Sequence, residues 1–312
     1  QLSQLIAELK RTSGALVAVT GQAPDLRLEF ERATVNSKIT LDAEGRVAGL
    51  WFDAPTPKGG YDAIAAQIEA LPGETSLLVV SGGKVRTGHN ADRPLAVGSA
   101  FKLAILAALD KKVAAGGIAW EDVVPLDPQR RSLPSGILQS WPDATPLTVA
   151  TLANLMISQS DNTATDMLLH LVGREEVQAE TPRNTPFLST REAFILKADK
   201  TLADQWGGGD AMARQALLAL IEDYDLPAPD AIASVMQPQV EWFLTAEELC
   251  ALLDRTADLA PFRIEPGLAR GGPWSSVAYK GGSEPGVLNL STRMTAKDGT
   301  AHCVVATWND GK

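Results

Sequence analysis

The chain has 312 residues, of which 45% are hydrophobic and 21% are charged. This is the composition of an ordinary globular protein, and no run of roughly 18 or more apolar residues predicts a membrane span. The formal net charge of -10 repels a phosphate backbone, which argues against a nucleic-acid partner. Because single hydrophobic cores stop growing at roughly 250 to 300 residues, we expect one main domain and a small second unit.

The N-terminal part of the chain has the pattern of a small α+β unit. Residues 1–10 place leucine and isoleucine side chains on one face at helical spacing, and residues 26–52 alternate as strands. Residues 53–60 contain two prolines and two glycines, a composition typical of a linker. We therefore expect a small N-terminal α+β unit over residues 1–55 and a main domain over residues 56–312.

The main domain has predicted strands at both ends and predicted helices between them. The predicted strands are, in chain order, residues 76–80, 85–89, 277–280, 286–296 and 302–308. The predicted helices are residues 61–71, one beginning near Ser99, 147–158, 163–172, 211–224 and 245–254, the last opened by the capping box Thr245-x-x-Glu248. Strands from such distant segments imply an antiparallel sheet faced by a helical layer, so we expect an α+β fold.

The two cysteines, Cys250 and Cys303, are too few for a disulfide scaffold. A bond between them cannot be assigned from sequence alone, so we interpret both as small buried apolar residues, and the redox compartment stays open. The chain begins at Gln1 without a basic segment followed by an apolar one, which fits either a processed exported protein or a trimmed chain.

Three short motifs occur in order along the main domain: Ser99-Ala-Phe-Lys102, Ser160-Asp161-Asn162 and Lys280-Gly281-Gly282. A serine at a helix start and a lysine three residues later share one helix face, so the amine can reach the hydroxyl. The helix N-terminus and desolvation both disfavour the ammonium form, which favours a neutral amine that can act as a base. The first motif therefore predicts an activated serine.

Each of these motifs is a weak signal when it is taken alone. Ser81-Gly-Gly-Lys84 matches the first pattern but lies in a predicted hairpin, and Lys58-Gly59-Gly60 matches the third but lies in the linker. Ser160-Asp161-Asn162 joins two predicted helices, where its ordinary interpretation is a helix N-cap. Three motifs in the right order and in suitable elements favour function over these separate structural interpretations.

The set of motifs resembles the signature of class A β-lactamases and penicillin-binding proteins. The resemblance covers residues 61–312 and includes the runs LPSGILQSWPDATPLTVATLANLMISQSDNTATDMLL, NTPFLSTREAFILK and YKGGSEPGVLNL. It implies a β-lactamase/transpeptidase-like fold of an antiparallel sheet with helical layers. The runs look most like a branch in which a domain similar to nuclear transport factor 2 or steroid isomerase precedes the hydrolase, as in cephalosporin-esterase-like proteins of clavam biosynthesis. Residues 1–53 would be a shortened form of that domain.

The resemblance implies a role for each residue of the first two motifs. Ser99 would attack the substrate carbonyl, and Lys102 would take its proton. Ser160 would relay a proton to the leaving nitrogen or oxygen. Asn162 would bind the amide side chain of the substrate and also Lys102, whereas Asp161 would point inward as a structural acceptor.

The resemblance implies that the third motif and its neighbour bind the substrate. Lys280 would attract the substrate carboxylate and tune Ser160, and Gly282 would belong to the same substrate-binding strand. The backbone N–H groups of Ser99 and Ser283 would form the oxyanion hole, where one donor is typically worth about 2.7 to 4 kcal/mol.

Two departures from the family pattern bear on activity. The Glu-x-x-Leu-Asn motif, whose carboxylate activates the water that cleaves the acyl-enzyme, is absent. The nearest acid by position is Glu192, a weak catalytic candidate that could instead cap a helix begun at Ser189 or Thr190. Gly281 stands where many relatives have Thr or Ser, which removes a hydroxyl that often hydrogen-bonds the β-lactam carboxylate. Acylation is therefore better supported than rapid turnover.

β-Lactam hydrolysis is the favoured function, and the alternatives are a carboxylesterase or D,D-peptidase of the same fold, or a penicillin sensor that acylates once. A Ser-His-Asp hydrolase is disfavoured because the three histidines are scattered and no G-x-S-x-G elbow occurs. The same scatter argues against a metal site. We expect a small-molecule β-lactam or ester substrate, no cofactor, no nucleic-acid or membrane partner, a monomer, and a periplasmic or secreted location.

Overall fold

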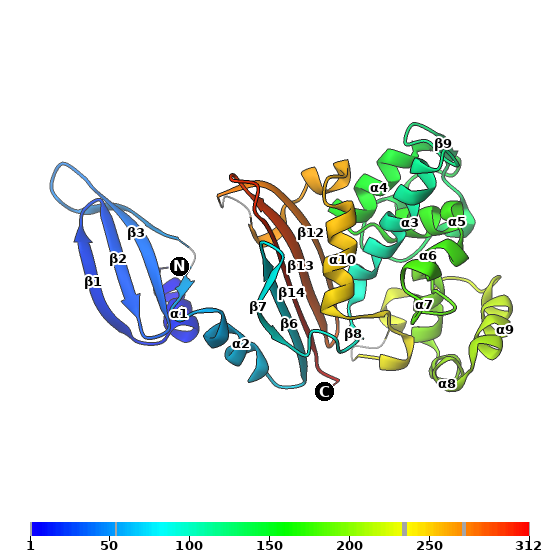
Figure 1. The fold of residues 1–312 in the computed structure, drawn as a ribbon, viewed down its shortest axis with the longest axis horizontal. Helices are drawn as coiled ribbons and strands as arrows, with labels where there is room; N and C mark the ends of the chain where they lie inside the picture. Colours follow the sequence, from blue (N-terminus) through cyan, green and yellow to red (C-terminus); the bar gives the residue numbers. More distant parts are fainter. Residues whose placement is uncertain (1, 54, 233–235, 270–272, 312) are drawn as a thin grey trace. The chain divides into compact units, whose positions relative to one another are not determined.

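The structure is a computed structural model that describes residues 2–53, 55–232, 236–269 and 273–311 (Figure 1). Contacts within the chain divide it into two compact units, Gln1–Gln67 and Ile68–Lys312. Within the described ranges, no helix is both long enough and apolar enough to cross a membrane. The three predicted motifs all lie in the second unit.

The first unit is a small α+β structure. Helix α1 (Leu2–Ser13) precedes an antiparallel sheet of order β1-β2-β3-β4, in which β5 also pairs with β3. The strands are β1 (Leu16–Gln22), β2 (Asp25–Phe30), β3 (Ala33–Leu41), β4 (Val47–Phe52) and β5 (Thr56–Pro57). Leu9 of α1 packs with Phe30 and Val35 of the sheet in a small core of its own. The predicted helix and strands are present, whereas β1 and β5 are additional strands, and β5 lies within the predicted linker.

The second unit contains one antiparallel sheet of order β12-β13-β14-β6-β7. Its strands are β6 (Glu74–Ser81), β7 (Lys84–His89), β12 (Trp274–Glu284), β13 (Val287–Ala296) and β14 (Ala301–Asn309). Two short ladders accompany it: β8 (Leu95–Ala96) with β11 (Phe243–Leu244), and β9 (Val123–Pro125) with β10 (Pro146–Thr148). The late strand β14 pairs with the early strand β6, which confirms the predicted sheet of distant segments, and β12 forms one edge.

Helices and short 3-10 turns fill the sequence between the strands. The helices are α2 (Tyr61–Glu69), α3 (Lys102–Ala114), α4 (Val149–Ser158), α5 (Asn162–Val172), α6 (Arg174–Glu180), α7 (Thr190–Ala198), α8 (Lys200–Gly208), α9 (Ala211–Ile221) and α10 (Ala246–Thr256). The 3-10 turns are η1 (Gly98–Phe101), η2 (Pro128–Arg130), η3 (Leu138–Ser140), η4 (Pro229–Ala231), η5 (Pro238–Val240), η6 (Ala260–Arg263) and η7 (Gly267–Ala269). Helix α10 packs on β13 and β14 and also contacts α3 (Figure 1). The predicted helices are confirmed, including the Thr245–Glu248 capping box, whereas α8 was not predicted and α7 was expected only in the capping alternative for Glu192.

Helix α3 lies in the middle of the core of the second unit. Every residue from Lys102 to Leu109 is buried, and all of them except Lys102 are apolar. A helix that is apolar on every side is a core helix, as observed here. A lysine is almost never fully buried without partners, so Lys102 identifies the point where the core meets a polar site.

A disulfide joins Cys250 of α10 to Cys303 of β14. Both cysteines are buried, as the sequence predicted, but the interpretation as separate small apolar residues is wrong because the sulfurs are bonded. A bond requires Cα atoms within about 7 Å of each other, and sequence alone does not show such a distance. In the structure the two Cα atoms lie 6.0 Å apart, and the bond ties α10 to the middle strand of the sheet.

Replacing both cysteines, Cys250→Ala with Cys303→Ala, is expected to lower the free energy of unfolding by about 2 to 4 kcal/mol, because the uncrosslinked unfolded chain has more conformational entropy. Urea unfolding followed by tryptophan fluorescence measures this change. A reducing agent should lower the midpoint of the wild type and leave that of the double variant unchanged. A wild-type midpoint that stays the same after complete reduction of the disulfide would contradict a stabilising role for the bond.

Candidate active site

Segments that are distant in sequence line one cavity of about 310 Å³ in the second unit. Its lining includes the predicted site residues Ser99, Ser160, Lys280, Gly282 and Ser283. Lys102 and Asn162 belong to the same cluster, because the Lys102 amine hydrogen-bonds both Ser160 and Asn162. The structure therefore brings together every predicted site residue except Glu192.

Ser99 lies in η1, which continues directly into α3 at Lys102. Phe101 anchors this turn in the core, since its ring stacks on Trp242 with the ring centroids 3.9 Å apart. The backbone N–H of Val97 also donates to the carbonyl oxygen of Trp242 at 3.0 Å. Ser99 is thus presented by a turn that is fixed by packing on one side and by a buried helix on the other.

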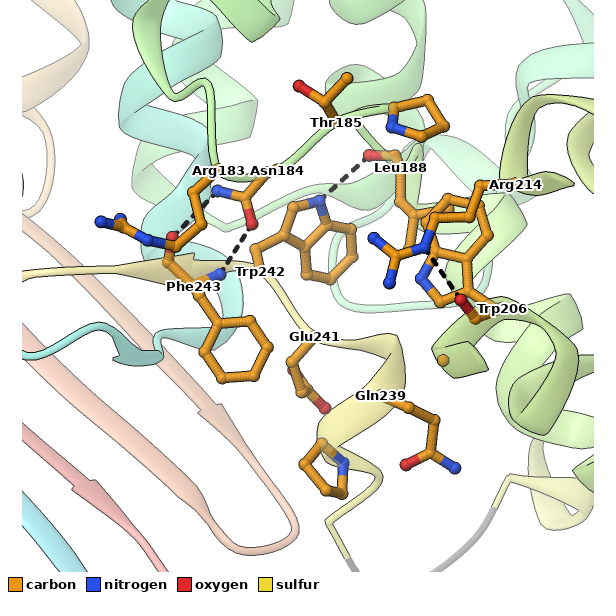
Figure 2. A pocket seen from close by; sticks show the side chains of 13 residues that line it. Arg183, Asn184, Thr185, Leu188, Trp206, Arg214, Gln239, Glu241, Trp242 and Phe243 are labelled. Carbon is orange, nitrogen blue, oxygen red and sulfur yellow. Dashed lines mark hydrogen bonds between the residues drawn. The ribbon is translucent and has the colours of Figure 1, made fainter. Parts of the chain in front are cut away.

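Trp242 is held in turn by hydrogen bonds around a second cavity of about 170 Å³ (Figure 2). Its indole N–H donates to the carbonyl oxygen of Leu188 at 3.2 Å. The Asn184 side chain donates to and accepts from the backbone of Phe243, at 2.9 Å in each case. These hydrogen bonds fix Trp242 and Phe243 in the wall of the second cavity. Because Phe101 stacks on Trp242, they also support the turn that carries Ser99.

Two glycines allow the backbones of η1 and β12 to approach each other closely. A Cβ on Gly282 would lie 2.0 Å from the carbonyl oxygen of Val97 and 2.7 Å from the nitrogen of Ser99. A Cβ on Gly98, whose φ is +48°, would lie 3.3 Å from the nitrogen of Ser283. Position 282 therefore accepts only glycine, and the nitrogens of Ser99 and Ser283 belong to two backbones in direct contact.

The Lys102 amine is fully buried and makes three hydrogen bonds. Nζ lies 2.6 Å from the carbonyl oxygen of Ser160, 3.0 Å from Ser160 Oγ and 2.7 Å from Asn162 Oδ1. Burial holds the pKa of Lys102 well below its ordinary value, and the nearby positive charge of Lys280 lowers it further, against the opposing effect of Asp166 and Asp161. A lowered pKa favours the neutral amine, which is the form that can accept a proton.

Ser160 lies between two lysine side chains. Its Oγ is 3.0 Å from Lys102 Nζ and 3.0 Å from Lys280 Nζ. Its φ of +56° is unusual for a residue other than glycine, and such backbone strain persists only where surrounding contacts impose it. Here the carbonyl oxygen of Ser160 accepts hydrogen bonds from Lys102 and from Ser135 Oγ, the latter at 2.7 Å. These contacts hold the hydroxyl of Ser160 in the cavity.

Lys280 enters the cavity from β12 and is only 3% exposed. Its amine donates to Ser160 Oγ at 3.0 Å and to the carbonyl oxygen of Gly281 at 2.7 Å. Burial disfavours the charged form and lowers the pKa of Lys280 to about 7. The charge of this lysine therefore changes within the neutral pH range.

Asp161 is the structural member of the second motif, as the sequence predicted. Its Oδ1 accepts the N–H of Ala164 at 2.8 Å and so caps α5. Its Oδ2 accepts the N–H groups of Ile137 and Leu138 at 2.7 Å and 3.0 Å. Asp161 is fully buried and binds the 137–138 loop to the start of α5, which fixes its neighbour Ser160 in the cavity.

Glu192 lies elsewhere and has other partners. It completes a capping box with Ser189 at the start of α7, and its carboxylate pairs with Arg174, with Oε1 2.6 Å from Nη2. The capping box that the sequence offered as the alternative for Glu192 is present, and the residue lies outside the lining of the cavity that contains Ser99.

Sequence reasoning missed a buried acid close to the cluster. Asp166 lies one turn after Asn162 on α5, and its carboxyl oxygens accept the N–H groups of Thr190 and Arg191 at 2.7 Å and 2.8 Å. Burial raises the pKa of Asp166 to about 7. The only signal in the sequence is an acid within the otherwise uncharged run Asn162–Leu169, at a spacing of four residues from Asn162.

The cavity also contains side chains that no motif contained. Tyr279 and Glu265 line it beside Lys280, and Ser135 lines it beside Ser160. Tyr279 directly precedes the third motif, which is a signal that sequence reasoning could have used. Glu265 and Ser135 come from loops, and only the tertiary structure brings them to the cavity.

Asp161→Ala is expected to lower the free energy of unfolding by about 3 kcal/mol or more, because three N–H groups, two of them buried, lose their acceptor at about 1 to 3 kcal/mol each. Asp161→Asn, which keeps one acceptor oxygen, should lose less. Chemical denaturation measures both changes. Asp199→Ala is the matched control: it removes an exposed N-cap of α8 and should lose about 0.5 to 2 kcal/mol. Equal losses at the two positions would contradict a special role for Asp161.

Residues 61–187 match the profile of the Beta-lactamase enzyme family. No curated protein matches the chain. Among solved structures, the β-lactamase of Sphaerobacter thermophilus DSM 20745 is similar at 24% identity and a TM-score of 0.55, over 80% of this chain and 87% of that chain. The β-lactamase of Desulfarculus baarsii DSM 2075 is similar at 20% identity and a TM-score of 0.53, over 81% of this chain and 91% of that chain.

A third solved structure is a point mutant of PBP-A in an acyl-enzyme complex with penicillin G. It is 18% identical, with a TM-score of 0.50, over 80% of this chain and 86% of that chain. These likenesses establish the fold, an α+β structure of the β-lactamase/transpeptidase type. The chain therefore contains a domain of this fold, and residues 61–187 match the Beta-lactamase enzyme family.

Proposed function

We propose that this chain is a serine hydrolase of the β-lactamase type that forms an acyl-enzyme on Ser99, with a β-lactam as the favoured substrate. The observation that carries the proposal is the buried Lys102 amine. It is hydrogen-bonded to Ser160, which lines the same cavity as Ser99. A buried amine of lowered pKa next to a serine is the arrangement required to activate a hydroxyl without histidine.

The proposed acylation uses these groups as follows. As the bond from Ser99 Oγ to the carbonyl carbon forms, the hydroxyl proton passes to the neutral amine of Lys102. The negative charge that develops on the carbonyl oxygen is met by the N–H groups of Ser99 and Ser283, whose backbones are in contact. When the bond to the leaving nitrogen or oxygen breaks, Ser160 Oγ gives that atom a proton and regains one from Lys102, at 3.0 Å.

Hydrolysis of the acyl-enzyme is supported less well than its formation. The Glu192 carboxylate is already engaged by Arg174 and by the Ser189 N–H, so it does not supply a base at the cavity. This favours slow release of the acyl group. A penicillin-binding protein that stops at the acyl-enzyme is accordingly the second candidate, and esterase or D,D-peptidase activity would use the same step. The exported location, the monomeric state and the likeness of residues 1–53 to nuclear transport factor 2 stay predictions.

An excess of a chromogenic cephalosporin is expected to add one acyl group to the wild type and none to Ser99→Ala, as measured by intact mass. Colour is followed in the same samples. Colour that continues far beyond one equivalent would support a β-lactam hydrolase, and colour that stops at one equivalent would support the second candidate.

The chain supplies its own matched control for this experiment. Ser81 is the serine of the other Ser-x-x-Lys pattern, and the structure places it opposite Lys84 at the hairpin between β6 and β7. Ser81→Ala should therefore acylate like the wild type. The proposed function would be overturned if the wild type gave neither an adduct nor colour, or if Ser99→Ala gave the same adduct as the wild type.

The preference for a carboxylate-bearing substrate is expected to fall as the pH rises through about 7, because Lys280 has its positive charge only below its pKa of about 7. At one pH unit above the pKa only about a tenth of the lysine stays charged, so the preference should fall about tenfold. The measurement is the acylation rate constant of a cephalosporin divided by that of its methyl ester, from pH 5.5 to 8.5. The division removes the effect of pH on Lys102, which both substrates share.

Lys280→Arg serves as the control for this pH profile, because an arginine stays charged throughout the range. Its ratio of rate constants should be flat with pH, and its rate with the methyl ester shows whether the variant still folds and acylates. A wild-type ratio that stays constant across pH 7 would contradict a role for the charge of Lys280.

A further inference from the structure

Position 281 lacks a side chain because Tyr279 occupies the space that it would need. A Cβ on Gly281 would lie 2.2 Å from the hydroxyl oxygen of Tyr279 and 2.9 Å from its Cζ. The two residues are separated by one position on β12, so their side-chain directions lie on the same face of the strand. The phenol therefore crosses position 281, and its hydroxyl oxygen lies close to where the first side-chain atom of residue 281 would be.

A second glycine makes room for the other end of the same ring. A Cβ on Gly267, at the start of η7, would lie 2.3 to 2.6 Å from Cγ, Cδ1 and Cδ2 of Tyr279. Gly267 has a φ of +62°, and its N–H donates to Glu265 Oε1 at 3.0 Å. The ring of Tyr279 thus lies against two positions that only glycine can fill, which fixes the direction of the hydroxyl.

Tyr279 belongs to the candidate active site. Tyr279, Lys280 and Gly281 line the same cavity as Ser99 and Ser160. Burial and the negative charge of Glu265 raise the pKa of Tyr279 above its ordinary value of 10.0. The phenol therefore keeps its proton at neutral pH and is a hydrogen-bond donor.

We propose that Tyr279 is a specificity-determining residue whose hydroxyl replaces the one that position 281 lacks and donates a hydrogen bond to the carboxylate of the acyl substrate beside Lys280. The inference rests on the proposed function, because it needs a substrate that is acylated on Ser99. It goes beyond that function in naming the group of the chain, other than Lys280, that selects a carboxylate.

The charge of the cavity makes such a directed donor important. Glu265 lines the cavity together with Lys280, so the cavity carries an acid as well as a base, and Lys280 is only partly charged near pH 7. Above pH 7 the charge of Lys280 is therefore a weak means of selecting an anion. A hydrogen bond from a neutral donor to a carboxylate is charge-assisted and depends on direction, so it distinguishes a carboxylate from an uncharged ester.

The test compares the same pair of substrates, a chromogenic cephalosporin and its methyl ester, in the wild type and in Tyr279→Phe. This substitution keeps the ring between the two glycines and removes only the hydroxyl. The ratio of the two acylation rate constants, carboxylate over ester, is expected to fall about tenfold or more, as for loss of a hydrogen bond to a charged group. An unchanged ratio would mean that Tyr279 only fills space and would overturn the inference.

A rescue experiment tests directly whether a hydroxyl at position 281 can replace the hydroxyl of Tyr279. Tyr279→Ala removes the whole phenol, so a side chain can then enter position 281, and the double variant Tyr279→Ala with Gly281→Ser restores a hydroxyl there. The carboxylate-over-ester ratio of the double variant is expected to be at least about fivefold higher than that of Tyr279→Ala alone. No recovery in a double variant that still acylates with the methyl ester would contradict an equivalent place for the two hydroxyls.

The failure of the inference and the failure of the proposed function give different results. A wild type that forms no adduct with either substrate would overturn the proposed function, and the inference with it. Adducts on Ser99 in every variant, with the same ratio throughout, would overturn the inference alone. A fall in the ratio for Tyr279→Phe together with recovery in the double variant supports both.

Discussion

Lys102 places an amine in the fully buried start of α3, where an ammonium without partners would cost several kcal/mol. The loss of solvent is offset by three acceptor atoms that come from Ser160 and Asn162. Those atoms are in reach only because Ser160 adopts a φ of +56° and because Asp161, through three hydrogen bonds, fixes the turn between α4 and α5. The same burial that lowers the pKa of Lys102 therefore requires the geometry that places Ser160 beside it.

The other side of the cavity depends on the position of β12, and two kinds of contact hold that strand. At one point its backbone touches η1, which the absence of a side chain at Gly282 permits. At its end, Glu284 pairs with Lys197 of α7, and Lys197 also pairs with Glu241 at 2.7 Å. Both members of the second pair are buried, and breaking a buried pair costs about 3 to 5 kcal/mol. The helical layer and the sheet edge are thus tied together next to the backbone that carries Ser283.

Sequence reasoning worked where local spacing or a repeated pattern decides the structure. A separation of three residues places Ser99 and Lys102 on one turn, and the order of the motifs was enough to expect Ser160 and Lys280 beside them. It did less well where a side chain has two possible partners. Glu192 fits both a water-activating base and a capping residue, and its pairing with Arg174 is visible only in the structure. Asp166, Glu265 and the bond between Cys250 and Cys303 depend on distances across the fold, which no local pattern contains.

The interpretation of Gly281 depends on the position of Tyr279. Taken alone, it is the loss of a hydroxyl from a substrate-binding motif, and that is how the sequence was interpreted. In the structure the glycine is a steric requirement of Tyr279, and Gly267 is a second such requirement at the other end of the ring. A Ser or Thr at 281 and the present position of Tyr279 exclude each other, so both cannot be present in one chain. The groups proposed for acyl transfer keep the pattern of the motif, whereas the groups that face the substrate beyond Ser99 differ, and this difference is where the selectivity of this chain has to be sought.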